Sequence, residues 1–402
     1  MTAGQSGSEI TPMTTITPTV SAKQKSMPFE ALGGFLGRKA QRHSLAGSTI
    51  VSADNHICLG GEDFFYENAP EHLKDRAPRI WFDEANGFWV IGIDGKSFHA
   101  WGSDALIKSV EGHLGAWNID ARIADMEAEG INTEIAFPQS IFHCFHLKDY
   151  EARAYIFREY NRYLGRLQRH APGRFYGVGI GQFWDPATAR EFIQEMKADG
   201  IKAVLLPGQP GVFPNGQKIH YSADEMRPLW DALAEADLAV CFHVGENVGF
   251  DSKGSMGVSV LAAVGGVYFR TIFGQLVYGG IFDDYPTLRV GFIEANLHWI
   301  PGMLQDAEMI HESYRPLLNP IPKLTPQEYW DRHCYTTFTY DPAGFKHLDR
   351  IGINKIMWSS DYPHNESTFG YTGAAIQWIV DAIGEAAARK VVGANAVEFF
   401  RL

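Results

Sequence analysis

Five ionisable residues stand where apolar, strand-like runs of the sequence end. Asp54 and His56 end the first run, His243 ends LAVCFHVG, Glu294 ends LRVGFIEA and Asp361 ends KIMWSSD. Two imidazoles and three carboxylates are a typical ligand set for a divalent metal ion. Because a strand alternates its side chains, Asp54 and His56 are expected to face the same side and to grip one ion together. The residue types and their spacing therefore predict a cation site assembled from four separate pieces of chain.

Each of these residues also has a purely structural interpretation. An isolated D-x-H pattern is usually a capped loop, and His243 would also suit a core histidine that bonds to the backbone. Glu294 would also suit a structural ion pair with Arg289 or another arginine, and Asp361 is a suitable N-cap for the segment that follows it. The metal interpretation is favoured because burying so many ionisable groups together without a cation would be costly.

Further polar and aromatic residues are candidates for contact with a substrate. His364 lies just after Asp361 and either lines the mouth of the site or caps backbone in a loop. Arg270, in VYFRTIFG, is the arginine that we consider for holding a substrate carboxylate. His143 and His146 form an H-x-x-H pattern, for which a second metal is the less favoured interpretation. The aromatic candidates lie in an insertion after the first strand: Phe64, Phe65 and Trp117.

The elements that must position these residues alternate along most of the chain. Strand-like segments cover residues 48–54, 133–138, 175–181, 203–208, 238–245, 288–295 and 355–361. Helix-like segments cover residues 120–130, 149–167, 185–200, 222–237 and 341–352. Several of the strands are apolar at consecutive positions, as strands buried on both faces are, and the alternation indicates a parallel sheet. The number of units favours a closed (β/α)8 TIM barrel of the α/β class over an open doubly wound sheet.

Two regions depart from this rhythm. Residues 1–45 are rich in Thr, Ser, Gly and Pro, and they predict an extended N-terminal arm that is weakly structured by itself. Residues 62–118 interrupt the barrel after its first strand, and FWVIGIDGKSF at 88–98 predicts a β-hairpin closed around IDGK. We expect residues 46–402 to form one barrel domain with the insertion over its mouth.

Composition narrows the functional classes. The chain has 402 residues and a formal net charge of −12, which argues against a surface for nucleic acid or anionic membranes. Its four cysteines form no CxxC pair, so neither a disulfide framework nor a zinc knuckle is expected. No segment resembles a membrane span or a secretory signal, and we expect a cytoplasmic protein. The aromatic stretch 268–286 either packs in the barrel wall or, with the arm, forms the interface of a homodimer or higher homo-oligomer.

The segments ending in FHVG, WIP and SDYPH, together with SADNH at the first strand, resemble the amidohydrolase-related family (amidohydrolase 2). This family of the metal-dependent amidohydrolase superfamily includes aminocarboxymuconate semialdehyde, resorcylate and carboxyvanillate decarboxylases. The resemblance runs from about residue 48 to the C-terminus. It implies that one divalent metal ion is bound by four residues: Asp54, His56, His243 and Asp361.

The chain departs from the family pattern at two positions. Asp54 stands where many members have His or Glu, and an oxygen donor there makes manganese more plausible while zinc still fits. Several of the decarboxylases carry a catalytic His on the sixth strand, whereas this chain has Glu294 nearest that point, with His298 one helical turn later. Glu294 and His298 therefore join Asp361 as catalytic candidates.

The expected reaction is hydrolysis of an amide or similar carbonyl in a small organic or aromatic substrate. A divalent ion lowers the pKa of water to about 7, while Asp361 takes the proton and returns it to the leaving group. Glu294 orients the water or binds a polar group of the substrate. One alternative is non-oxidative decarboxylation of an aromatic or unsaturated acid at the same site, which an arginine such as Arg270 beside the metal would favour. The second alternative is a barrel that binds a ligand without catalysis.

Overall fold

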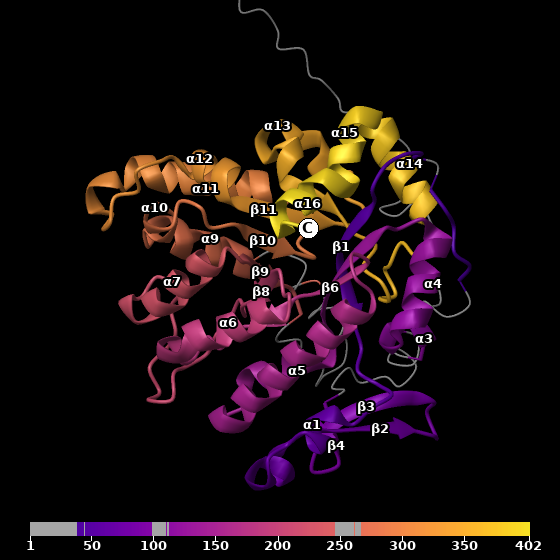
Figure 1. Cartoon of the computed structure of the whole chain (residues 1–402). Coiled ribbons are helices and arrows are strands. Elements are labelled where there is room, and N and C mark those ends of the chain that lie inside the picture. The colour runs from indigo at the N-terminus through magenta and orange to yellow at the C-terminus, as the bar shows by residue number, and fades with distance from the viewer. Residues whose placement is uncertain (1–37, 44, 99–109, 111, 246–260, 262–266) are drawn as a thin grey trace, which may run out of the picture.

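The computed structural model describes residues 38–43, 45–98, 110, 112–245, 261 and 267–402 (Figure 1). Most of the predicted N-terminal arm, residues 1–37 and 44, lies outside these ranges. Among the described residues, no helix is both long and apolar enough to cross a membrane.

Parallel strands follow one another around the molecule in chain order. They are β1 (Val51–Ile57), β5 (Thr133–Pro138), β6 (Phe175–Gly177), β7 (Gly179–Ile180), β8 (Ala203–Leu205), β9 (Ala239–His243), β10 (Val290–Ile293), β11 (Cys334–Phe338) and β12 (Ile356–Trp358). The pairing order is β1-β5-β6 in one sheet and β7-β8-β9-β10-β11-β12 in the other. Val178 alone separates β6 from β7, and its N–H donates to the carbonyl of Ala136 on β5 (2.8 Å). We therefore count β6 and β7 as one barrel strand, so that the barrel has eight parallel strands.

The first and last barrel strands are joined by backbone hydrogen bonds just beyond the end of β12. The N–H of Asp361 donates to the carbonyl of Asp54 (3.0 Å), and the N–H of His56 donates to the carbonyl of Tyr362 (2.6 Å). These bonds complete the ring of parallel strands, and the fold is the predicted (β/α)8 barrel. Three of the four residues that form these bonds, Asp54, His56 and Asp361, are among the predicted metal ligands.

Helices surround the strands (Figure 1). The longer ones are α4 (Ile119–Glu129), α5 (Tyr150–His170), α6 (Ala189–Ala198), α7 (Arg227–Ala236), α9 (Val267–Tyr278), α11 (Ile300–Ser313), α12 (Pro326–His333) and α14 (Thr372–Ile383). The shorter ones are α3 (Leu114–Trp117), η2 (Ser140–His146), η3 (Pro186–Thr188), η4 (Asp224–Met226), α10 (Ile281–Asp284), η5 (Arg315–Leu317), η6 (Gly344–His347), α13 (Leu348–Ile351), η7 (Ile353–Lys355), α15 (Glu385–Arg389), η8 (Lys390–Ala394) and α16 (Asn395–Phe400).

Local sequence signals explain where several helices begin and end. The side chain of Asn118 accepts a hydrogen bond from the N–H of Ala121 at the start of α4, and Gly130 ends that helix with φ +81°. Asp149 caps α5 in the same way as Asn118 caps α4, and Thr325 forms a capping box with Glu328 at α12. The predicted helix 341–352 is the exception, because only η6 and α13 form there.

The insertion after β1 contains α1 (Phe64–Glu67), η1 (Glu71–Arg76), β2 (Arg79–Asp83), β3 (Phe88–Ile93) and β4 (Lys96–Ser97). Strands β3 and β4 pair antiparallel, as predicted for the hairpin. Asp94 and Gly95 turn between them with φ values of 53° and 70°, the left-handed conformation that two-residue hairpin turns need. Strand β2 pairs with the other edge of β3.

Candidate metal centre

Asp54 and His56 are both buried within β1 and share one face of it. Between them, Asn55 points the opposite way, where its Oδ1 accepts hydrogen bonds from Ser52 Oγ (2.9 Å) and Ser360 Oγ (2.7 Å). Its Nδ2 donates to the carbonyl of Ile135 on the neighbouring strand (3.0 Å). The middle residue of the D-N-H triplet thus locks β1 against its neighbours, and the outer two project to a common space.

Six side chains from the carboxyl ends of the strands converge on that space. Asp54, His56 and His243 each offer a ligand atom, and these three atoms lie within 4.8 Å of one another. His56 belongs to a second such group with Glu294, Asp361 and His364. His243 Nε2 links the groups, since it lies 3.3 Å from Asp54 Oδ1 and 3.6 Å from Glu294 Oε2. The structure therefore brings together all five residues of the predicted cluster and adds His364.

The three imidazoles are oriented in a common way. Each has one ring nitrogen within hydrogen-bond distance of an oxygen outside the cluster: His56 Nδ1 at 3.1 Å from the carbonyl of Pro138, His243 Nδ1 at 2.7 Å from that of Val244, and His364 Nε2 at 3.0 Å from Gln139 Oε1. If that nitrogen carries the proton, the other nitrogen presents a lone pair to the cluster. This arrangement is the usual way in which proteins hold histidines that bind a metal ion.

Two buried atoms in the cluster have no hydrogen-bond partner among the described residues. They are His56 Nε2 and Asp361 Oδ1, which lie 3.6 Å apart, beyond hydrogen-bond distance. Buried polar atoms without partners are uncommon because each has lost its hydration without compensation. The imidazole nitrogen His56 Nε2 beside the carboxylate oxygen Asp361 Oδ1, which has His364 Nδ1 at 3.1 Å, is a donor combination that a divalent cation satisfies. The residues present therefore fit a bound metal ion.

The mutual influence of these groups appears in their pKa values. Burial raises the pKa of Asp361 well above its usual range, and the negative charges of Glu366 and Asp54 add to the effect. Burial likewise raises the pKa of Glu294, followed by the charge of Asp361. The pKa of His56 is lowered, first by burial and then by His364 and His243. Like charges confined in a space shielded from water produce these shifts.

The backbone at Glu294 and Asp361 adopts a conformation that is rare for residues with a side chain. Their φ values are 53° and 55°, and such left-handed residues collect at functional sites. Thr337 of β11 supports the same region: its Oγ1 accepts from the N–H of Glu294 (2.7 Å) and lies 3.3 Å from Asp54 Oδ2.

Thr337 and β11 were absent from the sequence-based prediction. The strand reads CYTTF, which has no aliphatic run, although Tyr, Phe and Thr all favour strands. That β-propensity was the signal that would have found it. Gln139, which follows β5 directly, was also missed.

The third catalytic candidate pairs with a carboxylate outside the predicted cluster. His298 Nδ1 lies 3.0 Å from Asp341 Oδ2, and Asp341 also accepts hydrogen bonds from the backbone N–H groups of Leu297 and Gly344. The group of possible metal ligands that contains Glu294 and Asp361 does not include His298. A catalytic role for His298 stays a prediction.

Of the residues predicted to contact a substrate, one lies at the donor cluster and the others have partners in other parts of the barrel. Phe64 and Phe65 are buried, with Phe64 stacked on Tyr163 of α5 at 4.7 Å between ring centroids. Trp117 is half-buried and packs edge-on against Trp89 of the insertion at 5.6 Å. Arg270 is exposed on α9 and forms an ion pair with Asp306 of α11. His364 is the predicted contact that lies at the donor cluster, with its Nδ1 3.1 Å from Asp361 Oδ1.

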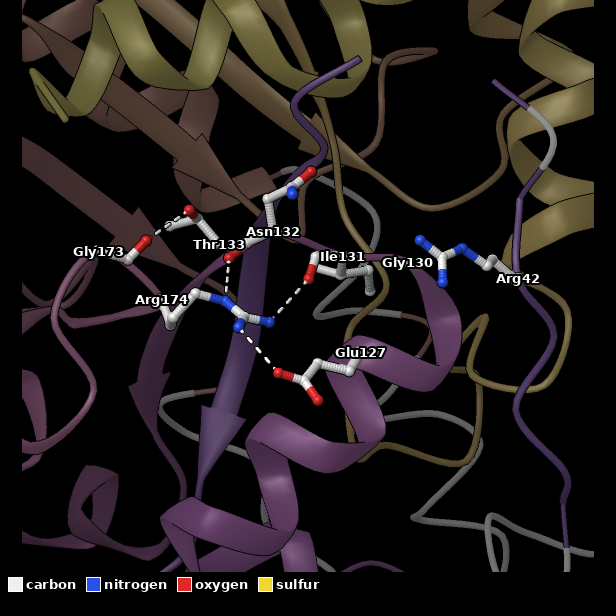
Figure 2. A pocket seen from close by; sticks show the side chains of 8 residues that line it. All are labelled: Arg42, Glu127, Gly130, Ile131, Asn132, Thr133, Gly173 and Arg174. Atoms are coloured by element: carbon white, nitrogen blue, oxygen red, sulfur yellow. Dashed lines mark hydrogen bonds and ion pairs between the residues drawn. The ribbon is translucent and has the colours of Figure 1, made fainter. Parts of the chain in front are cut away.

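A groove of about 510 Å³ lies at the opposite ends of the strands (Figure 2). Its lining consists of Arg42, Glu127, Gly130, Ile131, Asn132, Thr133, Gly173 and Arg174. Most of these residues precede β5 or β6, whereas the metal donors lie in β1 or at strand carboxyl ends. Arg174 is occupied by the carbonyl of Asn132 (2.7 Å) and by Glu127 (3.2 Å). The groove is therefore separate from the candidate metal centre.

Comparison with known proteins relates most of the chain, from residue 99 to the C-terminus, to one family. A family model described as Amidohydrolase matches residues 99–402. A comparison with curated proteins finds no match.

Solved structures share the fold. An amidohydrolase from Mycobacterium avium subsp. paratuberculosis has 20% identity and a TM-score of 0.71, covering 88% of this chain and 99% of its own. A 5-carboxyvanillate decarboxylase from Novosphingobium aromaticivorans, solved with manganese, has 18% identity and a TM-score of 0.65, covering 90% and 99%. A 2,6-dihydroxybenzoate decarboxylase from Rhizobium has 18% identity and a TM-score of 0.63, covering 88% and 99%.

Proposed function

The chain belongs to the amidohydrolase family, and from this premise we propose that it is a metal-dependent hydrolase of a small, uncharged carbonyl compound such as an amide. Asp54, His56, His243 and Asp361 would hold one divalent cation, zinc or manganese. The observation that carries the proposal is the convergence of three imidazoles and three carboxylates, two of whose buried atoms have no hydrogen-bond partner among the described residues. When bound, such a cation polarises a carbonyl and makes water a stronger nucleophile near neutral pH.

Asp361 is the residue placed to move protons. Its Oδ1 accepts no hydrogen bond from any described residue, and burial keeps its pKa above that of an ordinary carboxyl. A carboxylate with an oxygen facing the site can accept a proton from attacking water and return it to a leaving group. His364 Nδ1 contacts both oxygens of that carboxylate, at 3.1 Å from Oδ1 and 3.3 Å from Oδ2.

Glu294 faces the same space from β10. It lies 3.6 Å from His243 Nε2, and its backbone N–H is held by Thr337. We assign it the role of orienting the attacking water or a polar group of the substrate. A glutamate here adds a third carboxylate to the site.

This third carboxylate supports an uncharged substrate. The three carboxyl groups offer oxygen donors to a cation, and none of them attracts an anionic substrate. Among the described residues, no arginine or lysine forms an ion pair with Asp54, Glu294 or Asp361. Arg270, the residue considered for holding a substrate carboxylate, pairs with Asp306 on the outside of the barrel.

Non-oxidative decarboxylation is the second candidate, because several structural neighbours are decarboxylases of aromatic acids. The same cation would chelate the substrate carboxylate, and Asp361 would protonate the carbon that loses CO2. The likeness supports a shared fold, and the reaction has to be decided by experiment.

The deciding experiment combines metal analysis with a substrate screen. We expect about one equivalent of zinc or manganese per chain, loss of turnover on chelation, and recovery when either ion is restored. Amides, esters and lactones would then be screened beside hydroxylated benzoic acids, with Asp361→Asn as the inactive control. Cleavage of an uncharged carbonyl that is lost in the variant supports hydrolysis, whereas CO2 release that is lost in the variant would replace it by decarboxylation.

A further inference from the structure

One arginine of the N-terminal arm grips the loop that follows the metal centre. The guanidinium of Arg38 donates from Nη1 to the carbonyl of Ser367 (2.6 Å) and, less closely, to that of Phe369 (3.4 Å). Its Nη2 donates to the carbonyl of Asn365. The three acceptors are alternate residues of one loop, and the first of them is the residue directly after His364. More than 300 positions of sequence separate the arginine from them.

The loop that Arg38 contacts is joined to the candidate site by backbone hydrogen bonds. The N–H of His364 donates to the carbonyl of Asp361 (2.9 Å), and the N–H of Ser367 donates to the carbonyl of His364 (3.1 Å). The loop also returns to the last strand, because Ser367 Oγ and the N–H of Thr368 both donate to the carbonyl of Ser360 (2.7 and 2.8 Å). Ser367, whose carbonyl accepts from Arg38, is therefore linked by hydrogen bonds to His364 and, through it, to Asp361.

The arm itself is fixed on the barrel next to this loop. Glu129, at the end of α4, accepts hydrogen bonds from the N–H of Gln41 in the arm and the N–H of Gly370 in the loop (3.2 Å for the latter). A side chain at Gly370 would come within 3.1 Å of the Lys39 carbonyl, so arm and loop are in direct contact. Glu129 thus fixes the arm segment next to Arg38, while Arg38 itself bonds to the loop.

We infer that Arg38 is a positioning residue of the proposed metal centre, which it serves by holding the loop that carries His364 against Asp361. The inference rests on the proposed function. The fork of the guanidinium reaches several carbonyls at fixed angles, which a lysine ammonium cannot reproduce. Residues that orient metal ligands from outside typically change metal affinity or activity by about 10- to 100-fold when they are replaced.

The test uses the full chain with Arg38→Ala and Arg38→Lys, and Arg42→Ala as a matched control from the same arm. Arg42 is exposed in the groove of Figure 2, and among the described residues its side chain makes no hydrogen bond to the loop. Mn²⁺ affinity is measured by competition with a chelator, beside kcat/KM, the melting temperature and the effect of added ethylguanidine.

We expect Arg38→Ala to lose about 10- to 100-fold in Mn²⁺ affinity or kcat/KM, Arg38→Lys to recover only part of it, and Arg42→Ala to change by less than about twofold. Ethylguanidine should restore Arg38→Ala and leave Arg42→Ala unaffected. A folded Arg38→Ala protein with unchanged affinity and kcat/KM would overturn the inference, as would a lower melting temperature as the sole change. If Arg38→Ala fails to fold, Arg38→Lys decides alone, with full activity and affinity counting against the inference. Unchanged metal binding and activity in Asp361→Asn would instead refute the proposed function.

Discussion

The Nε2 atom of His243 lies 3.3 Å from Oδ1 of Asp54, although 189 positions of sequence separate the two residues. His243 is the last residue of β9 and Asp54 lies in β1, so the contact spans the interior of the barrel. Both side chains are buried. The contact makes these two donors a pair that a single cation can bridge.

Metal binding should stabilise the folded chain through this pair. Mn²⁺ at about a hundredfold excess over its dissociation constant is expected to add about 2.7 kcal/mol to the free energy of unfolding. His243→Asn should lose most of this gain, measured by chemical denaturation with and without the ion. His72→Asn, at an exposed histidine paired with Glu151, is the control and should respond as the wild type does. Equal stabilisation of all three proteins would contradict the assignment.

Replacing Asp361 by asparagine keeps the shape of the side chain and removes its ability to exchange a proton. We expect kcat to fall by about 10²- to 10⁴-fold, the usual contribution of a positioned acid or base. Asp381→Asn changes an exposed aspartate of α14 that accepts from Gln377, and should leave kcat unaltered. A variant at position 361 that keeps more than about a tenth of the wild-type kcat would show that another group carries the proton.

A buried ion pair joins α4 to β5 beside β1. Arg122 Nε lies 2.7 Å from Glu134 Oε2, both side chains are essentially inaccessible, and Arg122 Nη1 donates to the carbonyl of His56 (2.9 Å). Glu134→Gln leaves the guanidinium buried without its counter-charge, so we expect a loss of about 3–5 kcal/mol in the free energy of unfolding. Glu235→Gln breaks the exposed pair with Arg190 and should cost less than about 1 kcal/mol. Similar losses in urea denaturation of the two variants would refute the distinction.

The close neighbours of Gly115 leave no room for a side chain at this position. A Cβ atom there would overlap the hydroxyl of Tyr362 and approach Asp125 Oδ2 to 2.7 Å. Gly115→Ala should therefore destabilise the fold by about 1–3 kcal/mol, as overpacking does. A Cβ atom at Gly302 of α11 would meet no atom of the described residues within 4 Å beyond its own helix backbone, and Gly302→Ala should stabilise slightly because alanine favours helices. Melting temperatures that shift in the same direction for both variants would be inconsistent with these contacts.

Glu129 should make stability depend on pH. Burial raises its pKa from 4.5 to about 7, against hydrogen bonds from Thr372, Gln41 and Gly370 that lower it. Because the pKa is higher in the folded chain, the associated stability is present below pH 4.5 and is lost as the pH rises through 7.

Glu129→Gln removes this titration and keeps an oxygen acceptor. Relative to the wild type, its free energy of unfolding should therefore increase by about 3 kcal/mol between about pH 4.5 and pH 8. The control is Glu385→Gln, at an exposed glutamate paired with Arg389, and its difference from the wild type should stay nearly constant. A pH-independent difference for Glu129→Gln would rule out a raised pKa at this carboxyl.

Much of the barrel could be predicted because strand and helix signals are local. The cap Asp149 and the turn at Asp94 and Gly95 depend on a few neighbouring residues. β11 was missed because its stability comes from two neighbouring strands, which bury Thr336 and Thr337 completely. Burial of a polar strand is decided by what covers it, so the sequence carried only the β-propensity of its Tyr, Thr and Phe residues as a signal.

The sequence by itself determined the kinds of donor atom and, through the two-residue period of a strand, that Asp54 and His56 share a face. Only the tertiary structure decided that His364 joins the donors, whereas His298 lies against Asp341 and Arg270 against Asp306. The physical reason is that a side chain beyond the end of a strand takes its direction from the backbone turn there and from partners on other elements. Positive φ values at Glu294 and Asp361, and carboxylates contributed from distant segments, are properties of the folded chain as a whole.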